Sequence, residues 1–186
     1  MANLYYVIGA SGAGKDSLLD YARRQTKQYA NVIFAHRYIT RSADAGGENH
    51  IALDENEFLS RHTMGCFAMD WYSHDTHYGI GIEINQWLAK GISVVVNGSR
   101  GYLYQAAKIY PELRPILISV KSDVLRERLL SRGRENKEQI EHRLNQARKL
   151  ELSVAHSELM SIENNGSLNE AGEKLINIIQ KQAQCA

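Results

Sequence analysis

The stretch that decides the fold lies near the start of the chain and reads Tyr5-Tyr6-Val7-Ile8-Gly9-Ala10-Ser11-Gly12-Ala13-Gly14-Lys15-Asp16-Ser17. An apolar strand runs into the pattern G-x-x-x-x-G-K, which in turn opens a helix at Leu18 and Leu19. Glycines let the backbone wrap tightly, so that successive N–H groups face inward and surround phosphate oxygens. A lysine at this place reaches the outer phosphates of a nucleotide, and the helix start adds its positive dipole end. The stretch therefore predicts a nucleotide phosphate-binding loop over residues 9–17, with Lys15 as its cation.

The residue after Lys15 departs from the common form of this pattern, which has Ser or Thr there to bind Mg²⁺ through a hydroxyl. Here that residue is Asp16, followed by Ser17. Mg²⁺ prefers oxygen ligands, carboxylates among them, so Asp16 could ligate the ion directly. The alternative is that Asp16 only caps the helix, while Ser17 or water molecules serve the metal.

Length and composition predict one globular domain that spans residues 1–186. Hydrophobic residues make up 44% of the chain and charged residues 23%, as in ordinary globular proteins. The net charge of +1 argues against a broad nucleic-acid surface. No apolar run approaches the length of a membrane span. Cys66 and Cys185 match no metal-binding spacing, and reduced thiols fit a cytoplasmic protein.

Apolar strand-like runs alternate with helical patterns along the chain. The expected strands cover residues 4–9, 32–39, 66–72, 92–97, 114–120 and 159–163. The expected helices cover residues 15–28, 54–63, 82–90, 102–110, 122–132, 137–152 and 168–183. Strands rich in Val and Ile and separated by helices predict an α/β fold with a largely parallel sheet. The polar segment 42–49 is expected to be a mobile loop.

Two groups of basic residues could meet phosphate. The first ends the expected strand over residues 32–39 and reads His36-Arg37-Tyr38-Ile39-Thr40-Arg41. The second consists of Arg126, Arg128, Arg132, Arg134 and Arg143. Arginine donates two parallel hydrogen bonds to phosphate and remains charged. Gly133 is placed to break a helix and to let the segment after it move as a lid. The alternative is a solvated basic face paired with neighbouring glutamates.

The segment His74-Asp75-Thr76-His77 invites a metal-site interpretation. A turn between Trp71-Tyr72 and Tyr78-Gly79 is the better interpretation, because the other histidines share no ligand spacing with it. No Ser or Cys lies in a hydrolase motif, so nucleophilic catalysis is not indicated.

The chain resembles guanylate kinases over nearly its whole length. The matching strings are GASGAGKDSL, RYITRSADAGGENH, MDWYSHDTHYG, RLLSRGRENKEQIEHRL and IENNGSL. Within that superfamily it looks most like the bacterial ribose 1,5-bisphosphate phosphokinases of phosphonate catabolism, through the strings GKDS, AHRYITR, GGENHIAL, YGIGIEI and VNGSR. That resemblance implies a P-loop kinase that uses ATP and Mg²⁺ to convert ribose 1,5-bisphosphate to 5-phosphoribosyl 1-diphosphate (PRPP), with release of ADP.

Two departures from guanylate kinases agree with a sugar bisphosphate acceptor. Guanylate kinases carry a second arginine three residues after the position of Arg41, where this chain has Asp44. They carry an acidic residue where this chain has Asn97. Guanine presents N–H donors, so a neutral Asn97 weakens its recognition. Asp70 still matches a guanine-binding acidic position, so the exclusion of GMP is incomplete.

The resemblance also implies roles for individual residues. It implies a catalytic role for Lys15, Arg132 and Arg143, with the two arginines on a lid over about 128–143. The substrate-binding region would cover about 36–80, and the substrate-binding residues would be Arg41, His50, Asp70, Tyr78, Asn97 and Arg100. The competing interpretations are a guanylate kinase and a noncatalytic guanylate kinase-like interaction module. The expected partner is a small-molecule sugar bisphosphate, without nucleic acid or membrane, and a homodimer stays open.

Overall fold

The computed structural model describes residues 2–25, 31–45, 48–133, 136–153 and 156–184. The side chains of residues 132, 149–153 and 181–184 lie outside that description.

A five-stranded parallel sheet forms the centre of the molecule, as the sequence predicted. Its strand order is β2 (Val32–Phe34), β7 (Ser93–Asn97), β1 (Leu4–Gly9), β8 (Arg114–Ser119) and β9 (Met160–Glu163). All these strands point the same way, so their carboxyl ends meet at one edge of the sheet, where ligands bind in open α/β sheets. The phosphate-binding loop follows β1 at that edge, and Asn97 ends the neighbouring β7 opposite Val7.

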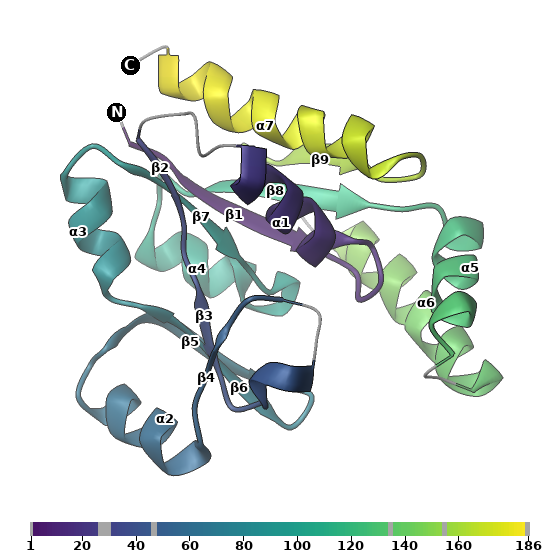
Figure 1. Cartoon of the computed structure of the whole chain (residues 1–186), viewed down its shortest axis with the longest axis horizontal. Coiled ribbons are helices and arrows are strands. Elements are labelled where there is room, and N and C mark those ends of the chain that lie inside the picture. The colour runs from purple at the N-terminus through teal and green to yellow at the C-terminus, as the bar shows by residue number, and fades with distance from the viewer. Residues whose placement is uncertain (1, 26–30, 46–47, 134–135, 154–155, 185–186) are drawn as a thin grey trace.

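Helices cover both faces of this sheet (Figure 1). The side chains of β1 alternate between the two faces: Tyr5 and Val7 join the core under α1 (Lys15–Gln25) and α7 (Leu168–Gln184). Tyr6 and Ile8 join the core on the other face, with α3 (Glu83–Ala89) and α4 (Leu103–Ile109). Because both faces are buried, the central strands are continuous apolar runs rather than alternating ones.

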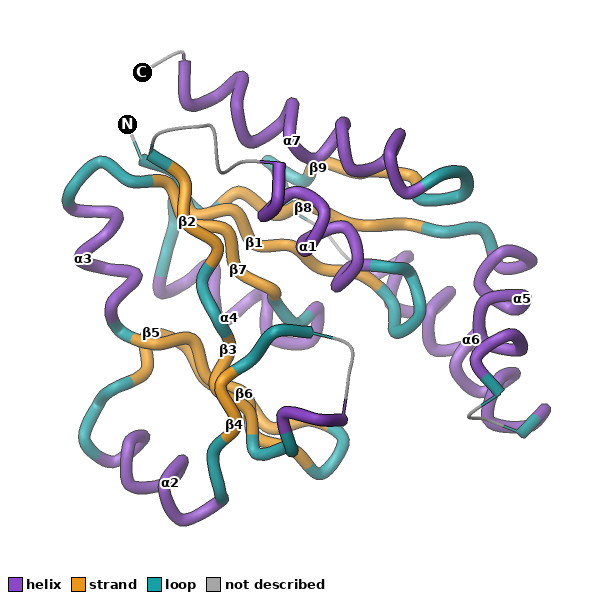
Figure 2. Tube along the Cα trace, in the orientation of Figure 1, coloured by secondary structure: helices purple, strands orange, loops and turns teal. Residues whose placement is uncertain are grey.

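A smaller four-stranded sheet lies beyond one end of the parallel sheet (Figure 2). Its strand order is β4 (Ile51–Ala52), β3 (Arg37–Ile39), β6 (Thr76–Gly81) and β5 (Phe67–Ser73), and α2 (Glu55–Thr63) packs beside it. The Asp54 side chain caps α2 by accepting from the Glu57 backbone N–H at 2.8 Å. This sheet lies within the region that the sequence assigned to substrate binding.

The prediction of one strand over residues 32–39 is wrong. The chain leaves the parallel sheet after Phe34 and enters the small sheet at Arg37. Apolar residues on both sides of the break hid it from the sequence pattern. The turn predicted at 74–77 is shorter, because only His74 and Asp75 have positive φ and Thr76 already begins β6. No group of three metal-ligating side chains occurs there or elsewhere in the described residues.

A helical hairpin of α5 (Ser122–Arg132) and α6 (Lys137–Ser153) stands at the other end of the parallel sheet. Gly133 ends α5 in the left-handed conformation (φ 62°), which confirms the predicted helix break. Leu125 and Leu129 pack against Ile140 and Leu144 to join the two helices. Short 3₁₀ turns lie at Ala43–Ala45 and Arg100–Tyr102.

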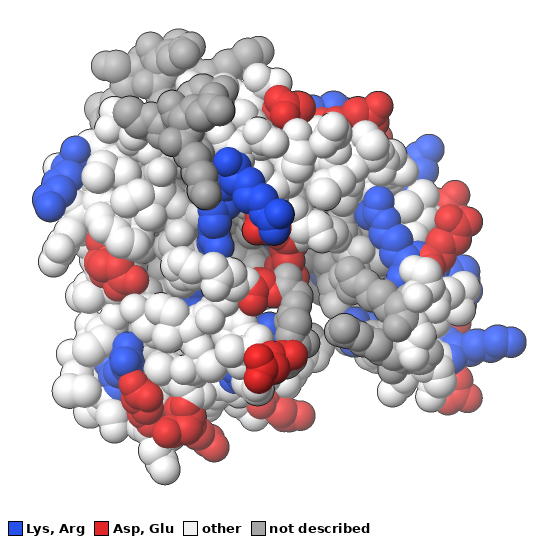
Figure 3. Space-filling view, in the orientation of Figure 1, with Lys and Arg blue, Asp and Glu red and all other residues white. Residues whose placement is uncertain are grey.

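Charged side chains of both signs are interspersed over the face of the molecule in Figure 3, and the coloured residues form no continuous basic surface there. Among the described residues, none of the helices combines the length and apolar character that a membrane crossing requires.

Candidate active site

The loop between β1 and α1 has the backbone geometry that the sequence predicted. Gly12 and Gly14 adopt φ values of 90° and 85°, which L side chains rarely adopt. The Ala13 backbone N–H donates to the Ala10 carbonyl at 3.1 Å, and α1 begins at Lys15. A Cβ on Gly14 would lie 2.5 Å from Nδ2 of Asn164, so only glycine fits there.

Side chains from α5, α6 and the segment after β9 contact this loop. Asn164, only 3% exposed, donates from Nδ2 to the Ala13 carbonyl at 2.7 Å. Arg143 of α6 donates to the Ser11 hydroxyl at 2.8 Å. Arg128 of α5 lies against Gly14, and its Nη1 is buried without a hydrogen-bond partner among the described residues. A buried, unsatisfied guanidinium N–H beside a phosphate-type loop is a donor left for an anion.

The second basic group of the sequence thus divides in the structure. Arg143, predicted to act from a lid, donates to Ser11 of the loop, and Arg128, which was not among the individually predicted site residues, lies against Gly14. Arg126 instead forms an ion pair with Glu141 on the surface, as the solvated-face alternative expected. Arg132 is the last residue of α5 and its side chain is not described, while residue 134 lies outside the described residues.

Lys15 extends into a buried cluster of charges. Its side chain is 14% exposed, and its Nζ lies 3.6 Å from Oδ1 of Asp16. Burial lowers the pKa of the Lys15 ammonium to about 8, and the Asp16 carboxylate counters part of that effect. Arg37 and Arg100 lie close enough to lower the Lys15 pKa further. The cluster therefore holds more positive than negative charge around Lys15, which suits a polyanionic ligand.

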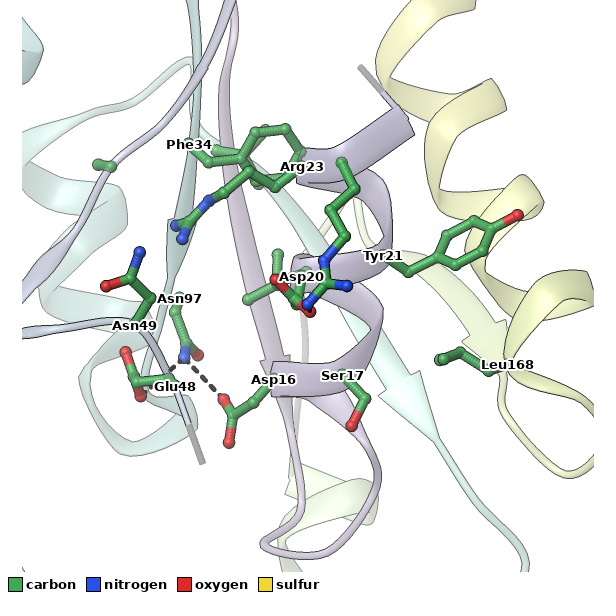
Figure 4. A pocket seen from close by; sticks show the side chains of 14 residues that line it. Asp16, Ser17, Asp20, Tyr21, Arg23, Phe34, Glu48, Asn49, Asn97 and Leu168 are labelled. Carbon is green, nitrogen blue, oxygen red and sulfur yellow. Dashed lines mark hydrogen bonds and ion pairs between the residues drawn. The ribbon is translucent and has the colours of Figure 1, made fainter. Parts of the chain in front are cut away.

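Asn97 lies between the carboxylates of Asp16 and Glu48 (Figure 4). Its Nδ2 donates to Oδ1 of Asp16 at 2.9 Å and to Oε2 of Glu48 at 3.2 Å. The atom facing two carboxylates must be the amide nitrogen, because an oxygen there would be repelled. The Asn97 residue is 6% exposed, and its Oδ1 is buried without a hydrogen-bond partner among the described residues.

Glu48 and Arg37 form a buried ion pair that the sequence did not reveal. The Arg37 guanidinium donates from Nε to Oε1 of Glu48 at 2.8 Å and from Nη2 to Oε2, and both side chains are 11% exposed. Glu48 belongs to segment 42–49, which the sequence predicted to be a mobile loop. Glu48 lies outside any helix or strand, as expected of a loop, but its carboxylate pairs with the buried Arg37 guanidinium, which would be costly to bury unpaired.

An aromatic row continues from this ion pair across the small sheet. The Arg37 guanidinium lies 4.9 Å from the Tyr78 ring centroid. Tyr78 stacks on Trp71 at 5.6 Å, and Trp71 stacks on Tyr102 at 5.5 Å. Tyr78, which the sequence predicted to bind substrate, therefore lies next to the charged cluster.

The other predicted substrate-binding residues lie in different settings. Arg41 has a buried Nε without a hydrogen-bond partner among the described residues, and it lies near enough to Arg37 to lower the Arg37 pKa. His50 is 8% exposed, and its ring nitrogens contact the backbone carbonyls of Glu48 and Arg41, each at 3.1 Å. The structure thus gives His50 backbone partners, whereas the sequence predicted a substrate contact.

Asp70 is the predicted residue that stands apart from the cluster. Its Oδ1 lies 3.2 Å from Nδ1 of His62 in α2. Burial is the main cause that raises the pKa of Tyr102, and the charge of the Asp70 carboxylate raises it further. No hydrogen bond or ion pair links Asp70 to Asn97 or Glu48 among the described residues.

A cavity of about 540 Å³ opens beside α1 and reaches this cluster. Asp16, Ser17, Glu48 and Asn97 line the cluster end, and Arg23 and Phe34 lie further along it (Figure 4). Asp16 is the most accessible carboxylate of the Lys15 cluster, with its side chain 39% exposed.

A glycine loop with a buried lysine, set at the carboxyl edge of a parallel sheet between a small sheet and a helical hairpin, defines a P-loop kinase fold. The chain belongs to the guanylate kinase family, whose sequence model matches residues 1–182. Curated relatives named ribose 1,5-bisphosphate phosphokinase PhnN share about half of their aligned residues with this chain. The protein of Psychromonas ingrahamii is 50% identical over 180 residues, which cover 97% of this chain and 91% of the relative. The protein of Desulfomicrobium baculatum is 52% identical over 180 residues, which cover 96% and 95%.

A solved structure shows the same fold. The guanylate kinase from Anaplasma phagocytophilum superimposes with a TM-score of 0.73 at 17% identity, over 98% of this chain and 86% of that chain. The comparison confirms the predicted α/β, guanylate kinase-like fold, with its parallel sheet flanked by helices.

Proposed function

We propose that this protein transfers the terminal phosphoryl group of ATP to the 1-phosphate of ribose 1,5-bisphosphate. A bond forms between the terminal phosphorus and an oxygen of the 1-phosphate, the bond to the bridging oxygen of ATP breaks, and the products are PRPP and ADP. The identity of about one half over nearly the whole chain to relatives named for this reaction is the observation that carries the proposal.

The site offers the charge distribution that phosphoryl transfer requires. The loop N–H groups and Lys15 would hold the ATP phosphates, with Arg128 and Arg143 on the hairpin side. Arg41, with its unsatisfied buried Nε, would bind the acceptor phosphate. The acceptor oxygen is already anionic near neutral pH, so positioning and charge neutralisation suffice without a strong general base. Arg132 would add its charge from the proposed lid over about 128–143.

The residues present fit a magnesium ion at the start of α1. Asp16 and Ser17 both line the cavity, and the Asp16 carboxylate is accessible from it. Mg²⁺ binds oxygen ligands and, when bound, neutralises charge on nucleotide phosphates. We propose that Asp16 ligates the ion, because a carboxylate beside ATP phosphates is otherwise repulsive.

Asp16→Ser should raise the Mg²⁺ concentration that half-saturates the reaction, because the ion loses one charged protein ligand. Asn97→Asp in that background should partly reverse the change, since residues 16 and 97 are in hydrogen-bond contact. A Mg²⁺ titration of the initial rate with the wild type and both variants measures the effect. Superimposable titration curves would mean that Asp16 is only a helix cap.

ATP binding should weaken as the pH rises through the Lys15 pKa of about 8. The ammonium attracts phosphate and the neutral amine does not, and one unit above the pKa only about one tenth of the lysine is charged. Calorimetric titration of ATP into the protein should show a Kd roughly tenfold higher at pH 9 than at pH 7. The Lys15→Arg variant, which remains charged, should lose this dependence; a flat wild-type profile would contradict the assignment.

Acceptor-dependent thermal stabilisation tests the proposed substrate. A ligand that binds only the folded state raises the midpoint of thermal unfolding, by an amount that grows with the logarithm of its concentration relative to its Kd. Ribose 1,5-bisphosphate should raise that midpoint in the presence of a nonhydrolysable ATP analogue and Mg²⁺, and GMP should not. Stabilisation by GMP alone would instead favour a guanylate kinase. A noncatalytic module should show no stabilisation by ATP with Mg²⁺.

A further inference from the structure

A continuous row of polar contacts links the nucleotide side of the site to the acceptor side. It runs from Lys15 to Asp16 (3.6 Å), from Asp16 to Asn97 (2.9 Å) and from Asn97 to Glu48 (3.2 Å). Glu48 then holds Arg37, which lies over Tyr78 of the small sheet. Asn97 is the one neutral group in the row between Lys15 and Arg37, and it is where the two carboxylates meet.

The row reaches the proposed acceptor arginine through His50. The two ring nitrogens of His50 contact the backbone carbonyls of Glu48 and Arg41. The His50 ring therefore links the backbone before residues 42–47 to the backbone after them. A shift of Glu48 would therefore be passed to Arg41. Because Asn97, Glu48 and His50 are all about nine-tenths buried, these contacts lie in a low-dielectric setting that strengthens them.

We propose that Asn97 is a positioning residue that couples nucleotide binding at Asp16 and Lys15 to acceptor binding at Arg41, through Glu48. This inference rests on the proposed function. Nucleotide and Mg²⁺ fix Asp16, Asp16 fixes the Asn97 amide, and the amide fixes Glu48 and the acceptor segment. Binding of the first substrate then orders residues that the second substrate also needs ordered, so the second binds more tightly. By thermodynamic linkage each substrate raises the affinity for the other by the same factor.

The chemistry of the amide explains why an asparagine suits this position. An NH₂ group carries two hydrogens and can donate to two carboxylates at once. An aspartate at residue 97 would have no donor and would put a third negative charge beside Asp16 and Glu48. The bridge also fixes the direction of the buried Asn97 Oδ1, which has no hydrogen-bond partner among the described residues and could accept from an O–H group of a ligand.

The coupling is measured as a ratio of two dissociation constants. Ribose 1,5-bisphosphate is titrated calorimetrically into the protein alone, and into the protein saturated with a nonhydrolysable ATP analogue and Mg²⁺. We expect the acceptor to bind the wild type at least about fivefold more tightly when the nucleotide site is filled. In Asn97→Ala and in Asn97→Asp the ratio should fall to about one.

Asn97→Asp gives the stricter test of the bridge. It keeps the side-chain shape, but it has no N–H donor and adds a negative charge beside Asp16 and Glu48, so an unchanged ratio in this variant would mean that the bridge does not couple the two sites. Asn145→Ala, an exposed change on α6, is the matched control and should keep the full ratio. Circular dichroism and thermal unfolding establish whether each variant is folded. If Asn97→Ala is not folded, the test rests on Asn97→Asp.

The outcomes distinguish this inference from the proposed function. If ribose 1,5-bisphosphate binds the wild type in neither titration, the proposed function is wrong and the coupling falls with it. If it binds, and the ratio is about one in the wild type or unchanged in folded Asn97 variants, only the coupling is overturned.

Discussion

Lys15→Ala is expected to lower kcat/KM by about a thousandfold while the protein stays folded. The ammonium lies in the charged cluster beside the loop, and it would face the phosphoryl group during transfer. Removing it should not harm folding, because burial lowers its pKa, which means that the charged form is held at a cost. Steady-state kinetics together with thermal unfolding measure both effects.

Lys108→Ala is the matched control for this prediction. Lys108 is exposed on α4 and lies over Tyr104, away from the loop. We expect its loss to change the rate little. Near-normal turnover in a folded Lys15→Ala protein would contradict the P-loop kinase assignment.

Glu48→Ala is expected to lower the midpoint of thermal unfolding by on the order of 10 °C. The change leaves the buried Arg37 guanidinium without its carboxylate, and breaking a buried pair in this way costs about 3–5 kcal/mol. It should also abolish detectable acceptor binding, because the segment that carries Arg41 loses its anchor. Differential scanning calorimetry and acceptor titration measure the two effects separately.

The double variant Arg37→Met/Glu48→Leu distinguishes stability from function. Removing both charges together eliminates the uncompensated guanidinium, so most of the lost stability should return while acceptor binding does not. Glu57→Ala is the control, since Glu57 pairs with Arg61 on the exposed face of α2 and its loss should cost less than about 1 kcal/mol. A Glu48→Ala protein that melts like the wild type would show that the pair is not needed.

The phosphate-binding loop could be predicted because its residues are contiguous. Strand, glycine turn, lysine and helix follow one another in thirteen residues, from Tyr5 to Ser17, and each has a local physical reason. The alternation of buried strands and helices likewise predicted the parallel sheet, and the break at Gly133 followed from its freedom to adopt a left-handed conformation.

The cluster around Asn97 could not be predicted in the same way. Its partners Asp16 and Glu48 lie 81 and 49 positions away, and they meet only because β7 pairs with β1 and the chain returns from the small sheet. Glu48 stands in a polar, glycine-containing segment that is typical of solvated loops, so its burial had no sequence signal. Arg37 did have one, as part of a basic group after an apolar strand, but its partner was not apparent.

The arginines show how far a charge pattern can be interpreted. Arg126 and Arg128 are two residues apart on α5 and therefore point in different directions. One pairs with Glu141 on the surface, and the other lies against the loop at Gly14. Composition alone made them equivalent, and only the packing of α5 against the loop separates them.

The most direct test of the proposed reaction is a product assay that offers ribose 1,5-bisphosphate and GMP side by side, with ATP and Mg²⁺. Phosphorus NMR follows the appearance of a diphosphate at the sugar 1-position and of ADP in equal amounts. We predict stoichiometric formation of PRPP and ADP from ribose 1,5-bisphosphate, and little or no GDP. Rapid formation of GDP with no sugar diphosphate would contradict the account.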